Sequence, residues 1–281
     1  MQRKYFAMRI WDVLYPLLLY YAVILFVMFL MQLFIGTDSS TYMIRQIVAT
    51  LVALPVVYTQ FYKPDAIWRQ AAKTMQSDEK KPQTGRKDAS ADAKSGVAAA
   101  GVRTALLIVA VAACCGTGLN NLLSMSPLVE ISAGFAQANE DFYGGAFVFQ
   151  IIGSAILTPV LEEMVYRGVI FARLRRDMGM LPAVLLSALL FGIMHFNIVQ
   201  FIYAFVLGVM LALFMEKCGH FFAAVLGHVT VNLISVVRTQ TGILQHTVDG
   251  SAFAWGFSVA VFAAGAVLLY IGFVRKLQAK E

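Results

Sequence analysis

Charged residues are scarce in this sequence. Lysine, arginine, aspartate and glutamate make up 14% of its 281 residues, whereas 59% are hydrophobic and the mean hydropathy is +0.72. A soluble domain carries about 25% charged residues, so the composition excludes an ordinary soluble protein and indicates a polytopic membrane protein. Cysteine is also rare. Three residues, two of them adjacent within an apolar run, exclude a disulfide framework.

Several common catalytic motifs are missing. The sequence contains no His-Glu-x-x-His, which excludes the usual metalloprotease helix, and no Gly-x-Ser-x-Gly, which excludes a serine nucleophile elbow. It also lacks a repeated pair of interrupted spans, which would have indicated a transporter. Any chemistry must therefore depend on other polar residues.

Long apolar runs predict an all-α, polytopic transmembrane helical bundle. A span needs about 20 apolar residues, and this template finds about eight spans, with seven spans or a re-entrant segment as the alternative. The predicted spans cover residues 11–35, 43–61, 104–125, 146–173, 181–197, 198–216, 221–237 and 252–274. The first run follows basic residues, as in a signal peptide. It is too long and lacks a small-residue cleavage site, so we expect a retained span.

The basic residues gather in the segments between spans. With a cytoplasmic N-terminus, all but three of the 22 lysine and arginine residues would be cytoplasmic, and the exceptions are Arg45, Arg167 and Arg238. Such a bias sets membrane orientation, so the net charge of +6 does not indicate a nucleic-acid partner. We predict an integral protein of the cell membrane with both termini in the cytoplasm.

The chain divides into five predicted segments. These are two N-terminal spans (1–61), a hydrophilic linker (62–103), a third span with an outer loop (104–145), a helical core (146–237), and a final loop, span and cytoplasmic tail (238–281). The linker mixes nine basic with five acidic residues and shows no sustained apolar periodicity. We expect it to be largely disordered and solvated, with a contact to anionic lipid head groups as the alternative.

The apolar core is interrupted by the polar stretch 161–168, which contains two carboxylates and a guanidinium. Each ionisable group at membrane depth costs at least about 2.5 kcal/mol, which indicates a functional site. Adjacent helical residues point about 100° apart, so Glu162 and Glu163 should have different roles. Glu163 and Arg167 have the i, i+4 spacing of a structural ion pair. Glu162 lacks such a partner, although Tyr166 at i+4 could donate a hydrogen bond to it.

Other polar residues occur on later predicted spans. His195 ends the fifth, and His228 and Asn232 share one face of the seventh at i, i+4 spacing. Burying these groups without partners is costly, so we expect them to approach Glu162. Upstream, Pro159 should kink the helix, leaving either room for water or a carbonyl satisfied by a neighbouring helix.

This inventory suits hydrolysis of an amide bond. A carboxylate and a histidine can activate water, while a second histidine and an asparagine amide can stabilise an oxyanion. Alternatively, Glu162, His195 and His228 could bind Zn²⁺ and leave its fourth position for water. The residues alone do not decide between these two arrangements.

The pattern of these residues resembles the CPBP family, which contains the type II CAAX prenyl endopeptidases and bacteriocin-processing enzymes and is also called the Abi family. Three motifs within 146–237 carry the resemblance: Glu162-Glu163-x-x-x-Arg167, Phe191-x-x-x-His195 and His228-x-x-x-Asn232. The resemblance implies an all-helical intramembrane endopeptidase with a cavity open to the cytoplasm and the lipid.

The resemblance also implies a role for each site residue. Glu162 with His195 would activate water, His228 with Asn232 would stabilise the oxyanion, and no metal would be needed. The substrate would be a peptide or membrane protein, with or without a lipid modification. A non-proteolytic membrane scaffold or an immunity or signalling partner is the alternative, and neither the substrate nor the oligomeric state follows from the sequence.

Overall fold

The computed structural model describes residues 2–62 and 91–275, and for 2–9 and 91–100 it describes only the backbone. Within these ranges the chain forms helices and connections and no strand, which confirms the predicted all-α fold. Seven of the described helical segments are long and apolar enough to cross a membrane. They comprise α1 (Gln2–Ile35), α2 (Ser39–Phe61), α4 (Ala91–Ser124), the composite span Phe147–Asp177, α11 (Ile198–Cys218), α12 (Phe222–Thr241), and α13 (Ala252–Leu269) with η4 (Tyr270–Val274).

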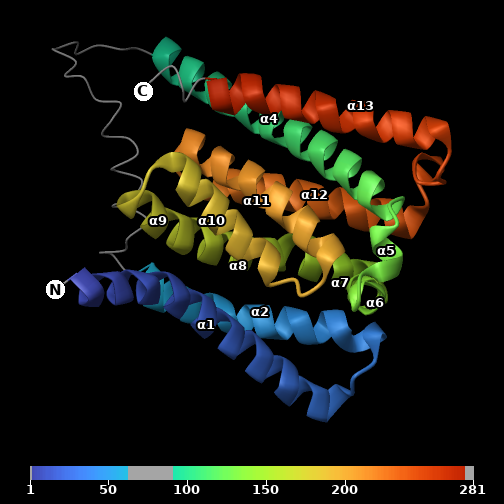
Figure 1. Cartoon of the computed structure of the whole chain (residues 1–281), viewed down its shortest axis with the longest axis horizontal. Helices are drawn as coiled ribbons and strands as arrows, with labels where there is room; N and C mark the ends of the chain where they lie inside the picture. The colour runs from blue at the N-terminus through green and yellow to red at the C-terminus, as the bar shows by residue number, and fades with distance from the viewer. Residues whose placement is uncertain (1, 63–90, 276–281) are drawn as a thin grey trace.

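The predicted fifth span is shorter than expected. The helix α10 (Met180–Ile193) has 14 residues, about 21 Å, whereas the hydrocarbon core is about 30 Å thick. It nevertheless runs antiparallel to α11, since Gly192 lies against Phe201 and Gly208 against Ala188. The chain direction therefore still reverses here, and α1 begins at the same end of the bundle at which η4 ends (Figure 1).

One predicted boundary needs correction. Residues 91–103 were expected in a disordered linker, but α4 already begins at Ala91. Residues 63–90 of that linker lie outside the described residues. The expected outer loop contains the short helices α5 (Leu128–Ile131) and α6 (Phe135–Tyr143).

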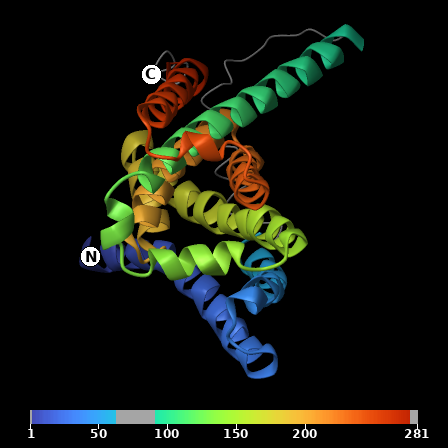
Figure 2. The same ribbon diagram turned by 90° about the vertical axis from the view of Figure 1, so that its right-hand side faces the viewer.

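The composite fourth span lies at the centre of the molecule. Figures 1 and 2 show it between the α1–α2 pair and the α4–α13 pair, with α10, α11 and α12 around it. The α4–α13 pair packs through glycines. Gly118 of α4 approaches Phe262, and Gly265 of α13 approaches Cys115. Only 17% of the most apolar window of α1, and of α13, is buried, so both helices present apolar side chains to the lipid.

Candidate active site

The central span changes its helical form around Pro159. It consists of α7 (Phe147–Gln150), the π-helical η1 (Ile151–Leu157), α8 (Thr158–Val165), the π-helical η2 (Tyr166–Phe171) and α9 (Ala172–Asp177). The N–H of Thr158 bonds to the carbonyl of Gly153, five residues back. At this spacing Pro159, which has no N–H, leaves the Ser154 carbonyl without a donor. The Nδ2 group of Asn232 donates to that carbonyl at 2.9 Å.

Where a kink was expected at Pro159, the chain forms a π-helical turn, and a hydrogen bond connects this turn to α12. Of the two outcomes considered for this proline, the structure has the freed carbonyl satisfied by a neighbouring helix. The residue that donates to this carbonyl is Asn232, which is also the candidate oxyanion donor. Helical spacing did not predict its bond to Ser154. An asparagine amide has two N–H bonds, so its contact with Ser154 leaves one available.

Glu163 is fully buried and shares one carboxylate oxygen between two partners. Its Oε1 accepts from Arg167 Nη1 at 2.9 Å and from His228 Nδ1 at 2.8 Å. The predicted i, i+4 ion pair is thus present. Its additional contact with His228 was not predicted, because it joins α8 to α12 across 65 positions. A carboxylate oxygen can only accept here, so Nδ1 carries the proton and Nε2 points away from Glu163.

Arg167 continues this network into α11. Its Nη2 donates to the Gly208 carbonyl at 3.0 Å, and its guanidinium lies 4.7 Å from the centre of the Phe191 ring. Phe191 also contacts His195 and His228, with ring centres 5.2 and 5.7 Å away. Phe191 was noted only as a motif position, but it is the residue against which both histidines pack.

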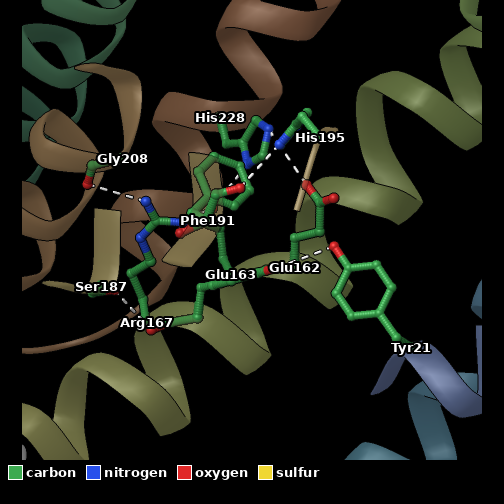
Figure 3. Close-up of polar contacts among 10 residues, drawn as sticks. Tyr21, Glu162, Glu163, Arg167, Ser187, Phe191, His195, Gly208 and His228 are labelled. Carbon is green, nitrogen blue, oxygen red and sulfur yellow. Dashed lines mark hydrogen bonds and ion pairs between the residues drawn. The ribbon is translucent and has the colours of Figure 1, made fainter. Parts of the chain in front are cut away.

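Glu162 faces the two imidazoles. Its side chain is 15% exposed, and its Oε2 lies 3.8 Å from His228 Nε2, too far for a direct hydrogen bond. Figure 3 shows the carboxylate directed toward His195 and His228. The two adjacent glutamates therefore have different environments, as their spacing predicted: Glu163 is fully buried against Arg167 and His228, and Glu162 is partly exposed.

His195 lies in the turn after α10 and not within a span. Its Nδ1 lies 2.9 Å from the Phe191 carbonyl, which can only accept, so the neutral ring has its free lone pair on Nε2. The next residue, Phe196, has a left-handed backbone with φ of 56°. Asn197 closes the turn by donating to the His195 carbonyl and accepting from the backbone N–H of Gln200 at the start of α11.

The predicted hydrogen bond from Tyr166 to Glu162 is not present. The hydroxyl of Tyr166 instead lies 3.2 Å from that of Tyr21 on α1. Spacing within one helix could not reveal a partner 145 positions away. The contact of Tyr62, which directly follows α2, was not predicted either. Tyr62 donates to the Met164 carbonyl at 2.6 Å, and a Cβ on Gly168 would lie 1.7 Å from its hydroxyl, which explains the glycine that directly follows the first motif.

The zinc alternative requires Glu162, His195 and His228 to lie together as ligands. Among the described residues, no three histidine, cysteine, aspartate or glutamate side chains are grouped so that they could hold a metal ion. Glu162, His195 and His228 face one site but do not meet this condition.

Comparison with known proteins bears on the same segment. A family model described as "Type II CAAX prenyl endopeptidase Rce1-like" matches residues 144–234, which include every candidate site residue named from the sequence. A curated protein of Bacillus subtilis (strain 168) named "Putative membrane peptidase YdiL" is 27% identical over 92 residues. The match covers 33% of this chain and 38% of that protein. No solved structure matches the chain. Residues 144–234 thus match the Rce1-like type II CAAX prenyl endopeptidases, and the family resemblance predicted from the three motifs is confirmed.

Proposed function

We propose that the protein is an intramembrane endopeptidase that hydrolyses a peptide bond close to the membrane. One observation carries this proposal: Glu162 Oε2 and His228 Nε2 face each other at 3.8 Å. Two hydrogen bonds of about 2.8 Å can span that distance through one shared oxygen atom. The oxygen would belong to a water molecule, which can donate to the carboxylate.

The proposed reaction uses Glu162 and His195 to activate water. Glu162 accepts a proton while His195 Nε2 holds the same water, and the resulting hydroxide attacks the peptide carbonyl carbon. The C–N bond then breaks, and the proton held by Glu162 passes to the leaving amine. The products are a new carboxylate and a new amine.

His228 and Asn232 are proposed to stabilise the tetrahedral intermediate. Nε2–H of a protonated His228 ring and the second N–H of Asn232 would donate to the oxyanion. The role of Glu163 is then to hold His228 through Nδ1, so that Nε2 faces the reacting atoms. Arg167 fixes Glu163 in turn and has no contact with the substrate.

The family likeness supports a CAAX-type peptide as the first probe. A suitable probe is a quenched fluorescent peptide ending in S-farnesylated Cys-Val-Leu-Ser, compared with the same peptide without the farnesyl group. Purified protein in proteoliposomes should cleave at least one of the two, and we expect Glu162→Gln to lower kcat by about 100-fold or more, since acid–base groups contribute about 10²–10⁴-fold.

The matched control is Glu216→Gln. Glu216 is also a largely buried carboxylate, but it pairs with Arg175 at 3.0 Å and lies outside the site. This variant should keep turnover near that of the wild type. Equal turnover by Glu162→Gln and wild type, or no cleavage of either peptide by the wild type, would overturn the proposed function.

A further inference from the structure

The helix α1 lies beside the site but outside the segment that matches the peptidase family. It contributes two adjacent tyrosines at the middle of its apolar stretch, Tyr20 and Tyr21, within the candidate span Ile10–Ile35. Tyrosines of membrane helices usually lie at the two interfaces with water, where the hydroxyl is hydrated. A tyrosine pair in mid-span needs polar partners within the protein.

The two rings are held against the central span. Tyr20 is 3% exposed and packs edge-to-face on Tyr21, with ring centres 4.6 Å apart, and on Tyr166 at 6.5 Å. Tyr21 is half-buried, and its hydroxyl lies 3.2 Å from that of Tyr166.

The hydroxyl pair leaves one proton without a partner. Tyr166 is fully buried, so its O–H must donate to Tyr21 to avoid an unsatisfied buried donor. Tyr21 then accepts from Tyr166 and keeps its own O–H, which makes no hydrogen bond to any other described residue. In the view of Figure 3, Tyr21 lies on the side of Glu162 that is away from Arg167.

We propose that Tyr21 binds the substrate: its hydroxyl donates a hydrogen bond to a backbone carbonyl of the peptide that lies against Glu162. The helix α1 thereby forms one wall of the active site. This inference rests on the proposed peptidase function and adds a substrate-binding residue to it. An extended peptide carries a carbonyl acceptor at every residue. A single O–H donor in an otherwise apolar wall can bind one of these carbonyls.

The first test is Tyr21→Phe, which keeps the ring packing and removes only the hydroxyl. With the farnesylated probe we expect KM to rise about 3- to 10-fold while kcat stays within about twofold, because a neutral hydrogen bond is worth about 0.5–1.5 kcal/mol and this one serves binding. If the hydroxyl had only a structural role, its removal would lower the melting temperature and leave KM unchanged. Tyr270→Phe, at a tyrosine that is 51% exposed on η4, is the control and should change neither constant. A KM for Tyr21→Phe within twofold of the wild type would overturn the proposal.

A second test does not depend on turnover. Photoreactive p-benzoylphenylalanine is placed at position 21 or at position 270 of the Glu162→Gln protein, and the farnesylated probe is added before illumination. We expect crosslinking from position 21 that excess unlabelled peptide removes. Crosslinking no stronger than that from position 270 would overturn the proposal. If the wild type fails to cleave the probe but position 21 crosslinks to it, the hydrolase function fails and the peptide contact stands.

Discussion

At the scale of single residues, one oxygen atom of Glu163 holds both a guanidinium and an imidazole. Glu163→Gln keeps the shape of the side chain but leaves Arg167 as an uncompensated buried cation, which costs about 3–5 kcal/mol. We expect a lower free energy of unfolding in denaturant titrations. Turnover should also fall, because His228 loses the carboxylate that orients it.

A double variant separates these two effects. Glu163→Gln combined with Arg167→Met removes the stranded cation, so part of the lost stability should return. Turnover should not return, because a neutral amide holds a protonated His228 less strongly than the carboxylate does. A double variant with wild-type kcat would show that Glu163 does not act through His228.

Asn197 offers a second test of positioning. Its side chain caps α11 and holds the turn that carries His195, so Asn197→Ala should cost about 1 kcal/mol of stability and also lower kcat. Ser251→Ala removes a comparable cap from α13, far from the site, and should cost similar stability without changing kcat. If both variants lowered kcat equally, the loss would reflect stability and not the position of His195.

The residue roles that sequence could predict were those that depend on local geometry. Helical spacing separates Glu162 from Glu163 and pairs Glu163 with Arg167, because all three share one helix. The hydroxyl of Tyr166 reaches α1, and no spacing rule within one helix gives that partner. The hydrogen bond from Asn232 to Ser154 could not be predicted from sequence either, because it depends on a π-helical turn.

At the scale of elements, α10 and α11 are held close together by a glycine. A Cβ on Gly208 would lie 3.0 Å from Ala188 and 3.2 Å from Arg167 Nη2. Gly208→Ala should push the helices apart and disturb the arginine that supports Glu163. We expect a loss of about 1–3 kcal/mol in denaturant unfolding, the usual cost of overpacking, together with reduced turnover.

Two further variants test this explanation. Adding Ala188→Gly should restore part of the lost stability, because it removes the Cβ nearest to the new methyl group. Gly256→Ala on α13 meets no atom within 4 Å and should not destabilise the protein. A Gly208→Ala protein as stable as the wild type would argue against tight packing here.

The length of α10 could not be read from hydropathy. The apolar character continues from α10 into α11, and only His195, Asn197 and Gln200 are polar near the turn, so a window of about 20 residues joins the turn to the preceding helix. The break at Ile193 depends on the left-handed Phe196 and on the Asn197 cap. Neither feature changes the mean hydropathy enough to be detected.

At the scale of the whole molecule, the short α10 determines how many times the chain crosses the membrane. If it crosses despite its length, eight crossings place the α1–α2 and α12–α13 connections on the same side, as their common end of the bundle in Figure 1 suggests. Single cysteines on a background without the three native ones test this with a membrane-impermeant maleimide. We expect Asp38→Cys and Asp249→Cys to be labelled from one side of intact cells, and Asp177→Cys and His220→Cys only after permeabilisation. Labelling of Asp38→Cys and Asp249→Cys from opposite sides would contradict an even number of crossings.

The overall architecture was more predictable than the site that it encloses. Apolar runs of sufficient length predicted all seven long helices, because the bilayer imposes one simple rule on each. The placement of α1 against the central span follows from contacts such as those of Tyr20 and Tyr21 with Tyr166. Such contacts between distant segments have no counterpart in local sequence pattern.

The π-helical η1 also has a consequence for how this sequence can change over time. Losing or gaining one residue between Ile151 and Leu157 would turn α8 by about 100° relative to the helix before it, and would carry Glu162 away from His228. An exchange of one apolar residue for another in the same segment leaves that rotation unchanged. Selection should therefore tolerate substitutions in η1 and reject single-residue insertions and deletions.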